Sequence, residues 1–367
     1  MDTLLLASKL SKRLHAESLA YNILNKLPVL PPPHHPKGEF REIIKEISAD
    51  NGETCICDRI LLRKKYLYDV GIIVPVYNAE QHIAECLDSI LGQNTDFTFH
   101  VIIINDGSTD GSRKILRKYE ERPNVTVIDQ ENKGHSGARN TGLENCFGKY
   151  VTFVDADDRL PVNAIEILMQ KAVKGDFDIV GGGYSLFADD KIIQNTLPAQ
   201  GRLFGFPWGK VYKAEIWSNI QFPPGYWFED TVCSFIIHRR SSKISTVSDI
   251  VYEWRKNTSS ISFLSKGKPK ILDTLYVTNQ LLRDCKDLLL PFDMQFYDIL
   301  LHQFKVNAVR IYSLANRQVN YANFIWSKDA LKIYFKDTQY GSISYKNVEL
   351  AIKNESYKQF LLSCLFL

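Results

Sequence analysis

The sequence predicts an α/β fold with a mostly parallel sheet flanked by helices, an N-terminal extension and a C-terminal helical region. Three observations support this prediction. Five short apolar runs between residues 69 and 180 alternate with segments of helical spacing, which is typical of right-handed βαβ units. Polar residues rich in Asp, Asn and Gly follow four of these runs. Beyond residue 270 the alternation ends and helical spacing takes over.

Length and composition bound the class of protein. A chain of 367 residues is long enough for two or three structural units. We expect a helical extension and linker over 1–68, an α/β domain over 69–265 and a helical accessory domain over 266–367. The hydrophobic content of 45% and charged content of 24% are ordinary for a soluble globular protein. The net charge of +3 is too small to indicate nucleic-acid binding.

Cysteine usage and the chain ends indicate a cytoplasmic protein, with the inner face of the cell membrane as the alternative location. Seven scattered cysteines in apolar surroundings favour reduced thiols over a disulfide framework. We find no secretory signal and no window near the ~20 apolar residues of a membrane span. The apolar end at 360–367 is expected to dock on the core. Pairing with another subunit and peripheral membrane contact are the alternatives.

The first 68 residues precede the alternating region. Residues 1–27 carry Leu and Ala at helical spacing and predict a helix. The proline-rich segment 28–36 predicts a stiff linker or crossing segment. A short helix is expected around 40–47, and a strand pair near 55–68.

The alternating region supplies the sheet. Its apolar runs predict buried strands at 70–76, 99–104, 125–128, 150–154 and 178–180. The segments between them predict helices at 79–91, 112–121, 137–146 and 161–174. Ligands of parallel α/β sheets bind beyond the carboxyl ends of the strands, so the residues that follow each run are the candidate site. Short strands and loops are expected over 184–265.

The fourth apolar run ends in three carboxylates, Asp155, Asp157 and Asp158. Carboxylates crowded at a strand end repel one another and are costly to desolvate, and a divalent cation offsets both effects. Such hard oxygen ligands suit Mg²⁺ or Mn²⁺, which usually also hold substrate phosphates. A solvated turn is the alternative, because Asp is common where strands end.

Three further strand ends carry polar residues. They are Pro75-Val76-Tyr77-Asn78, Asn105-Asp106-Gly107-Ser108-Thr109-Asp110 and the segment from Asn132 to Asn140 that contains Arg139. Each segment alone is explained by turn chemistry. Together with the carboxylates they supply an aromatic face, an acceptor for an imide or hydroxyl, an arginine for phosphate and a metal site. Those are the groups that hold a nucleotide diphosphate.

In order and spacing, these four segments make residues 69 to about 260 resemble a family 2 glycosyltransferase of the GT-A fold. The resemblance implies a UDP-sugar donor, with Pro75 and Tyr77 against the nucleobase and Asp106 accepting from the uracil imide. It also implies that Asp155 and Asp157 form the Mn²⁺ or Mg²⁺ pair, with Asp157 on the ion and Asp155 at the ribose or a bound water. Simple packing of Tyr77 and helix capping by Asp106 are the alternatives.

The resemblance adds Asn78, Arg139, Ala156 and Arg255 to the donor-binding residues. Arg139 lies in the first turns of a predicted helix, where its charge and the helix N-terminus both face phosphate. A surface ion pair is the alternative. Arg255 is expected to reach the diphosphate, and the serine-rich loop after it to close over the donor. Many relatives carry a histidine ligand there, whereas this chain has Asn257, so a third protein metal ligand is not implied.

The acceptor side resembles the family in Glu229 and Asp230. The resemblance implies that Asp230 is the general base, which takes the acceptor proton as its oxygen attacks the anomeric carbon. Capping of the helix that follows is the alternative role, and the two roles are compatible. Glu229 is expected to orient the loop or bind the acceptor. Trp208, Lys210 and Trp227 are implied to line the sugar pocket.

These features predict an inverting, metal-dependent glycosyltransferase that moves a sugar from a nucleotide sugar to a glycan, glycolipid or glycoprotein. Bacterial polysaccharide or glycan assembly is the expected setting, and a homo-oligomer is left open. A nucleotidyl- or phosphosugar transferase would need a glycine-rich basic loop near the first strand, and the sequence has none there. A non-catalytic sugar-binding or assembly subunit is the alternative, and the retained carboxylates argue against it.

Overall fold

The computed structural model describes residues 3–27, 40–48, 50, 52–59, 66–257, 261–336 and 338–367. The chain packs into two compact units. The helical unit comprises Met1–Gly52, Ser260–Asn279 and Pro291–Leu367, and the sheet unit comprises Glu53–Ser259 and Gln280–Leu290. The predicted linker at 28–36, residues 60–65 of the predicted strand pair and the serines at 259 and 260 lie outside the described residues.

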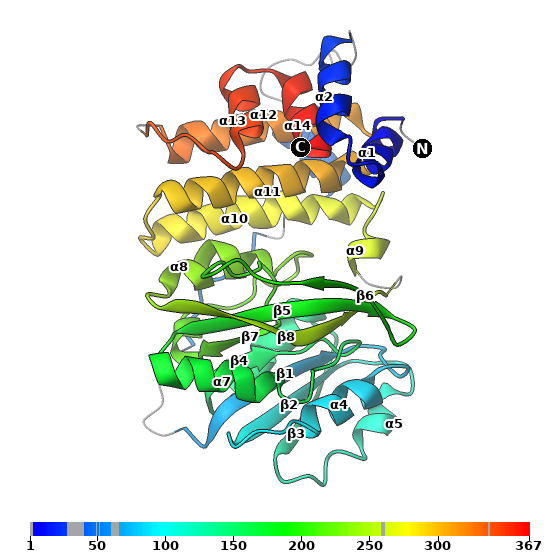
Figure 1. Ribbon diagram of the computed structural model, residues 1–367, viewed down its shortest axis with the longest axis vertical. Helices are drawn as coiled ribbons and strands as arrows, with labels where there is room; N and C mark the ends of the chain where they lie inside the picture. Colours follow the sequence, from blue (N-terminus) through cyan, green and yellow to red (C-terminus); the bar gives the residue numbers. More distant parts are fainter. Residues whose placement is uncertain are drawn as a thin grey trace. The chain divides into compact units, whose positions relative to one another are not determined.

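The sheet unit is built on one mixed sheet (Figure 1). Within the described residues its strands are β1 (Tyr68–Val76), β2 (Phe99–Asp106), β3 (Val125–Gln130), β4 (Gly148–Phe153), β5 (Ile179–Ala188), β6 (Lys191–Thr196), β7 (Lys210–Lys213) and β8 (Ile244–Arg255). Their order is β3-β2-β1-β4-β7-β5-β6, and β8 pairs with β5. The predicted α/β class, with its mostly parallel sheet and helical C-terminal region, is confirmed.

The four strands β1 to β4 run parallel and end at one edge of the sheet. In the register of β1 with β2, Val76 lies opposite Asn105. β4 pairs with the other side of β1. The polar segments that follow these strands therefore emerge side by side, as the sequence predicted. The fifth strand does begin at Ile179, but β7 inserts between β4 and β5 and pairs antiparallel with both.

Alternation along β1 divides the sheet unit into layers. Val70, Ile72 and Val74 belong to a buried cluster that also holds apolar side chains of α4 (Ile83–Leu91) and α7 (Ala164–Gly175). Ile73 points to the opposite face, where it lies against Gly142 of α6 (Gly134–Glu144). The sheet therefore lies between two helical layers, which is the arrangement that fully apolar strands require.

The helices of the sheet unit are α4 (Ile83–Leu91), α5 (Ser112–Leu116), α6 (Gly134–Glu144), α7 (Ala164–Gly175) and α8 (His238–Arg240), with a 3₁₀ turn at Ala214–Trp217 and a π-helical stretch at Cys233–Ile237. Two helices are shorter than predicted. The helix expected over 79–91 begins at Ile83. The helix expected over 112–121 ends at Leu116, because the amides of Lys118 and Tyr119 bond three residues back and tighten the chain into turns.

The helical unit contains α1 (Thr3–Arg13), α2 (Glu17–Lys26), α3 (Phe40–Ile47), α9 (Ile261–Leu264), α11 (Met294–Tyr312), α12 (Arg317–Tyr334), α13 (Lys346–Lys353) and α14 (Tyr357–Phe366), and a 3₁₀ turn at Pro269–Leu272. The boundary between the units falls within α10 (Asp273–Asp287). The sequence predicted one helix over 1–27. The structure has two, because His15 adopts a φ of 52° and the Ala16 amide bonds the Ser11 carbonyl, which closes α1.

The chain's two ends meet in the helical unit, where α1 and α2 lie beside the C-terminal helix α14 (Figure 1). Ser8 Oγ donates to the carbonyl of Leu365 at 2.6 Å. Phe360, Leu361 and Leu362 are almost fully buried. The expectation that the apolar C-terminal end docks on the core is therefore confirmed.

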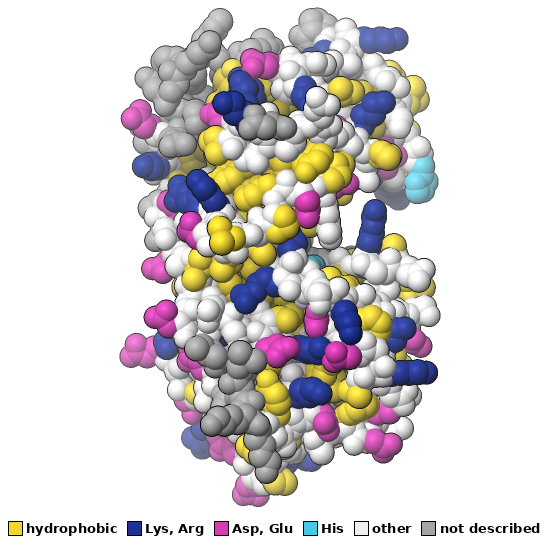
Figure 2. All heavy atoms as spheres, turned by 90° about the vertical axis from the view of Figure 1, so that its left-hand side faces the viewer, with side chains coloured by type: hydrophobic (Ala, Val, Ile, Leu, Met, Phe, Trp, Pro, Cys, Tyr) yellow, Lys and Arg dark blue, Asp and Glu magenta, His cyan; other side chains and the backbone are white. Residues whose placement is uncertain are grey.

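The distribution of charged side chains and of cysteines agrees with what the composition indicates. Cationic and anionic side chains are interspersed on the face shown in Figure 2, in keeping with the small net charge. All seven cysteines lie within the described residues, form no disulfide, and with the exception of Cys57 are buried. No helix in the described ranges combines the length and the apolar character needed to traverse a bilayer.

A glycine at the start of β4 allows the close approach of β1 and β4. A Cβ added at Gly148 would clash with the backbone nitrogen of Gly71 and lie 2.7 Å from the carbonyl carbon of Val70. Backbone atoms cannot give way as flexible side chains can. We therefore expect Gly148→Ala to lower the free energy of unfolding by about 1–3 kcal/mol, measured by denaturant titration.

Gly205→Ala is the matched control, because a Cβ there meets nothing within 4 Å. Its free energy of unfolding should stay within about 0.5 kcal/mol of the unmodified chain. Equal stability of the two variants would show that β1 and β4 can separate without cost.

Candidate active site

Asn78 joins the end of β1 to the loop after β2. Its backbone N–H donates to Ser108 Oγ at 3.1 Å, and its Oδ1 accepts from the Thr109 N–H at 2.8 Å. Asn78 adopts a φ of 48°, a left-handed conformation that asparagine tolerates better than most residues. Pro75 is buried within β1, whereas Tyr77 is 51% exposed. The loop therefore offers one accessible aromatic ring beside fixed polar groups.

Asp106 joins the end of β2 to the segment that enters α6. Its side chain is almost fully buried, and Oδ1 accepts from Gln130 Nε2 at 2.6 Å and from the Lys133 N–H at 2.8 Å. Asp106 does not cap α5, because other residues accept from the amides at the start of that helix. Asp110 accepts from the Ser112 N–H and Glu80 from the Gly111 N–H at the start of α5. Asp106 therefore fixes the strand end rather than the helix.

Arg139 is the centre of the site. It projects from α6, is 3% exposed, and places one guanidinium nitrogen 2.8 Å from Asp155 Oδ1 and the other in contact with Glu229. Its guanidinium also lies 5.3 Å from the ring centre of Phe222. Burial by itself would lower the pKa of Arg139, but the charges of Asp155 and Glu229 outweigh burial and raise it. The ion pair is therefore buried and not at the surface, and the predicted phosphate contact stays a prediction.

Tyr252 of β8 holds the carboxylate segment that follows β4. Its hydroxyl accepts from the Asp155 N–H at 3.1 Å and donates to Asp158 Oδ2 at 2.7 Å. Asp158 also accepts from the Arg255 N–H at 2.7 Å. Burial, with the charges of Asp157 and Asp155, raises the pKa of Asp158 well above its usual range. The sequence gives no local signal of this role of Tyr252, because Asp155 and Asp158 lie 97 and 94 positions earlier.

Asp157 is held by the segment that follows β8. It is partly buried, and Oδ2 accepts from Asn257 Nδ2 at 2.9 Å. Burial raises the pKa of Asp157, and the neighbouring charge of Asp155 acts in the same direction. Ala156 between them is buried. This short segment therefore concentrates negative charge that a cation would offset.

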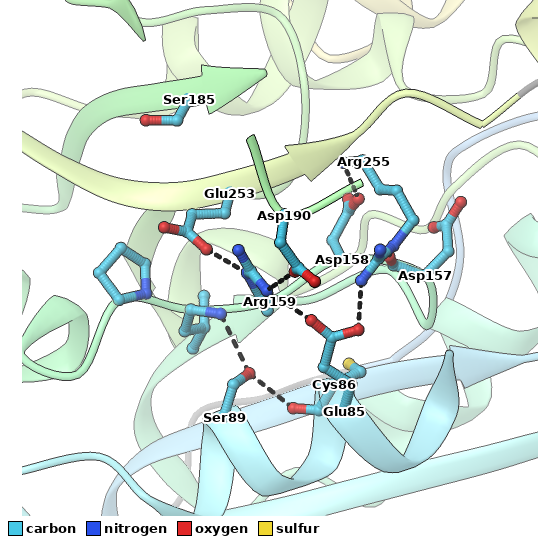
Figure 3. A network of polar contacts seen from close by, with 12 residues as sticks. Glu85, Cys86, Ser89, Asp157, Asp158, Arg159, Ser185, Asp190, Glu253 and Arg255 are labelled. Atoms are coloured by element: carbon cyan, nitrogen blue, oxygen red, sulfur yellow. Dashed lines mark hydrogen bonds and ion pairs between the residues drawn. The ribbon is translucent and has the colours of Figure 1, made fainter. Parts of the chain in front are cut away.

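A network of ion pairs, drawn in Figure 3, surrounds this segment on the side of α4. Glu85 accepts from Arg159 at 2.6 Å and from Arg255 at 2.5 Å. The two guanidinium groups lie over the ring of Phe187, at 4.2 and 4.4 Å from its centre. Arg159 also contacts Glu253. The sequence placed Arg255 at the diphosphate and missed Glu85, whose position on α4 gives no local signal of its partners.

The loop before the π-helical stretch turns sharply ahead of Glu229 and Asp230. Phe228 adopts a φ of 66°, after which Glu229 is buried against Arg139 and Asp230 is partly buried. The Asp230 carbonyl accepts from the Cys233 N–H at 2.9 Å, so Asp230 begins the helical turn that the sequence predicted after it. Trp227 is also partly exposed. The loop therefore directs one carboxylate into the protein and leaves the next near its surface.

Two residues predicted for the sugar pocket lie in the core. Trp208 is 6% exposed and stacks between Phe206 and Tyr252, with ring centres 4.4 and 4.3 Å apart. Lys210 Nζ donates to the carbonyls of Phe206 and Trp208 at 2.7 and 3.1 Å. Burial lowers the pKa of Lys210 to about 8. Trp208 therefore supports Tyr252, while Lys210 holds the backbone of Phe206 and Trp208. The contact of both residues with a sugar stays a prediction.

The carboxylate pair fits a divalent cation that substrate helps to hold. In the parts of the chain that the structure describes, no three His, Cys, Asp or Glu side chains are arranged to bind a metal ion. Mg²⁺ commonly uses one or two carboxylates and completes its shell with water and substrate phosphates. Asp155 and Asp157 supply two such carboxylates, and burial together with the charge of Asp155 raises the pKa of Asp157.

The chain is similar in sequence to known glycosyltransferases. Residues 71–222 match the sequence model of a family described as glycosyl transferase family 2. The putative glycosyltransferase EpsH of Bacillus subtilis is 32% identical over 237 residues, which cover 57% of this chain and 67% of EpsH. Glycosyltransferase GlyA of Streptococcus pneumoniae is 34% identical over 218 residues, 53% of this chain. The chain spans only 31% of GlyA.

A solved structure resembles the chain over nearly its whole length. It is the mannosyltransferase PcManGT of Pyrobaculum calidifontis in complex with GDP-Man and Mn²⁺. The alignment covers 99% of this chain and 96% of that one, at 18% identity and a TM-score of 0.49.

The bridge at Arg139 should be the most costly polar contact to break in the site. Arg139→Met leaves the buried Glu229 and the partly buried Asp155 without this counter-charge, so we expect the free energy of unfolding to fall by about 3–5 kcal/mol in denaturant titration. The double variant Arg139→Met/Glu229→Gln should recover part of that loss, because one stranded carboxylate becomes neutral.

Arg113→Met is the matched control. Arg113 also bridges two carboxylates, Asp129 and Glu120, but all three side chains are between 31% and 49% exposed. Arg113→Met should lower the free energy of unfolding by only about 0.2–1 kcal/mol. A similar small cost at Arg139 would mean that water enters the buried bridge and solvates the carboxylates.

Proposed function

Because the chain belongs to glycosyl transferase family 2, we propose that it moves a sugar from a nucleotide sugar to a hydroxyl of a glycan, glycolipid or glycoprotein, with inversion at the anomeric carbon. The observation that carries this proposal is the buried bridge of Arg139. It ties Asp155, on the segment proposed to bind the donor diphosphate, to Glu229, the neighbour of the proposed base Asp230. The guanidinium of Arg139 therefore fixes both Asp155, beside the proposed site of the sugar donor, and Glu229, beside the proposed site of the sugar acceptor.

The donor nucleobase is proposed to lie against Tyr77 and to meet Asp106. Both hydrogen bonds that fix Asp106 within the chain end on Oδ1. Oδ2 can therefore accept from the imide of a uracil ring, which supports a uridine nucleotide as the donor. The exposed ring of Tyr77 supplies an apolar face for the base.

The diphosphate is proposed to lie above Asp155 and Asp157, which would hold Mn²⁺ or Mg²⁺. When bound, the cation neutralises charge that develops on the leaving nucleotide. Tyr252 and Asn257 orient the segment through the Asp155 N–H and the Asp157 carboxylate. Arg255 donates to the Asp157 carbonyl at 2.6 Å, so its charge lies beside the same segment.

Asp230 is proposed to take the proton from the acceptor hydroxyl. Glu229 is chemically equivalent, but it is buried and its carboxylate is in contact with Arg139, so it is not placed to meet an acceptor hydroxyl. Its role is to position the loop. A general base opposite the leaving group, without a second nucleophile, accounts for inversion.

The metal assignment can be tested with Asp157→Ala. Removing this carboxylate relieves repulsion with Asp155, so the free energy of unfolding should not fall. The rate of nucleotide release is measured on a panel of UDP-sugars with and without Mn²⁺. We expect Mn²⁺ to raise the rate of the unmodified chain but not that of Asp157→Ala. Asp176→Ala is the control, because Asp176 is an exposed carboxylate that pairs with Lys213. Stimulation equal to that of the unmodified chain would refute the assignment.

The base assignment can be tested with Asp230→Asn and Glu229→Gln side by side. Asp230→Asn keeps the shape of the side chain but cannot take a proton, so nucleotide release should fall about 10²–10⁴-fold at unchanged stability and UDP affinity. Glu229→Gln should instead lower stability, because Arg139 loses a counter-charge. Normal turnover in Asp230→Asn, with collapse in Glu229→Gln, would reverse the two roles.

A further inference from the structure

The first helix of the helical unit, α1, buries two serines and exposes leucines, which is the reverse of the usual arrangement in an amphipathic helix. The face of α1 that packs inward carries Leu4, Ser8 and Ser11, all buried. Both serines satisfy their hydroxyls internally, Ser8 on the Leu365 carbonyl and Ser11 on the Ser8 carbonyl. Other leucines of the same segment point outward. A helix that buries serine and exposes leucine has an outer face suited to a partner and not to water.

The exposed aliphatic side chains form two rows. The first row is Leu6, Leu10 and Leu14, and the second is Leu19, Ile23 and Leu27 on and just after α2. Members of each row are spaced by four residues, so Leu6 and Leu10 lie along one face of α1 and Leu19 and Ile23 along one face of α2, while Leu14 and Leu27 are the residues just after the two helices. All six side chains are between 45% and 65% exposed. Scattered exposed leucines need no explanation, but two ordered rows on consecutive helices do.

Basic side chains accompany the rows. Lys9, Lys12 and Arg13 are exposed on α1, and Lys26 is exposed at the end of α2. Glu17 is the one acidic residue among 3–27. Exposed leucines beside Lys and Arg on a helical surface are the composition that binds anionic lipid, where the apolar row enters the acyl boundary and the cations meet the headgroups.

We propose that these two aliphatic rows dock on an anionic lipid surface. The proposal goes beyond the proposed transfer reaction and does not depend on it. It also differs from membrane contact by the apolar C-terminal end, because Phe360 to Phe366 are buried against the body of the helical unit.

Charge favours lipid over a second copy of the chain. A symmetric contact between copies would place the same surface patch of each copy against the other. Lys9, Lys12 and Arg13 of one copy would then face the same cations of the next, with only Glu17 to balance them. An anionic headgroup layer instead complements every one of these charges.

The test uses the full chain in sedimentation with phosphatidylcholine vesicles, with and without phosphatidylserine. We expect binding that requires phosphatidylserine. The triple variants Leu6→Gln/Leu10→Gln/Leu14→Gln and Leu19→Gln/Ile23→Gln/Leu27→Gln should each lose about tenfold or more in affinity. The triple variant Lys9→Gln/Lys12→Gln/Arg13→Gln should lose about fivefold in vesicle affinity for each side chain replaced, and its remaining affinity should depend less on salt concentration.

Two matched triples control for general loss of apolar or basic surface. Ile333→Gln/Ile343→Gln/Leu350→Gln removes exposed aliphatic side chains elsewhere in the helical unit. Lys114→Gln/Arg117→Gln/Lys118→Gln removes exposed cations of the sheet unit. Both should bind vesicles as the unmodified chain does.

Three outcomes would overturn the proposal. The first is absence of vesicle binding. The second is equal binding to neutral and anionic vesicles. The third is equal loss of binding in the row variants and their controls. Light scattering of the same samples identifies the rival, since a dimer that dissociates in the row variants would assign the rows to self-association.

Discussion

The buried ion bridge of Arg139 is the constraint on which the site depends. A guanidinium that is 3% exposed is costly to desolvate, and it stays charged because two carboxylates flank it. Those carboxylates belong to Asp155, just after β4, and to Glu229, in the loop before the π-helical stretch. Neither segment can move alone without stranding a charge. The geometry of both therefore follows from one side chain on α6.

A second set of contacts gives the carboxylate segment its rigidity. Tyr252 bonds both Asp155 and Asp158 from β8, while Arg255 reaches Glu85 on α4. Trp208 stacks on the ring of Tyr252, with ring centres 4.3 Å apart. Crowded carboxylates are thus held by neutral hydroxyl and amide donors as well as by cations. This combination fixes their position and leaves part of their charge unbalanced, which suits a ligand that arrives with a cation.

The sequence predicted what depends on near neighbours. Apolar runs and the turns after them placed β1 to β4, and the polar segments at their ends, without any knowledge of packing. The partners of Arg139 could not be predicted in this way, because Glu229 lies 90 residues away. The resemblance implied a place for Lys210 in the sugar pocket, and nothing in the local sequence indicated that its amine also donates to two backbone carbonyls in the core. The inward serines of α1 were also missed, because local spacing identifies a helix but not which of its faces packs inward.

The insertion of β7 between β4 and β5 has a consequence for synthesis of the chain. Residues 148–153 of β4 leave the ribosome well before residues 210–213 of β7, which pair with their free edge. During that interval a nascent chain can assemble β1 to β4 but presents an open strand edge to its surroundings. Such edges are templates for wrong pairing between chains. The short β7 therefore acts as a closure that arrives late, and ribosome-bound chains that pause before it carry the greatest risk of aggregation.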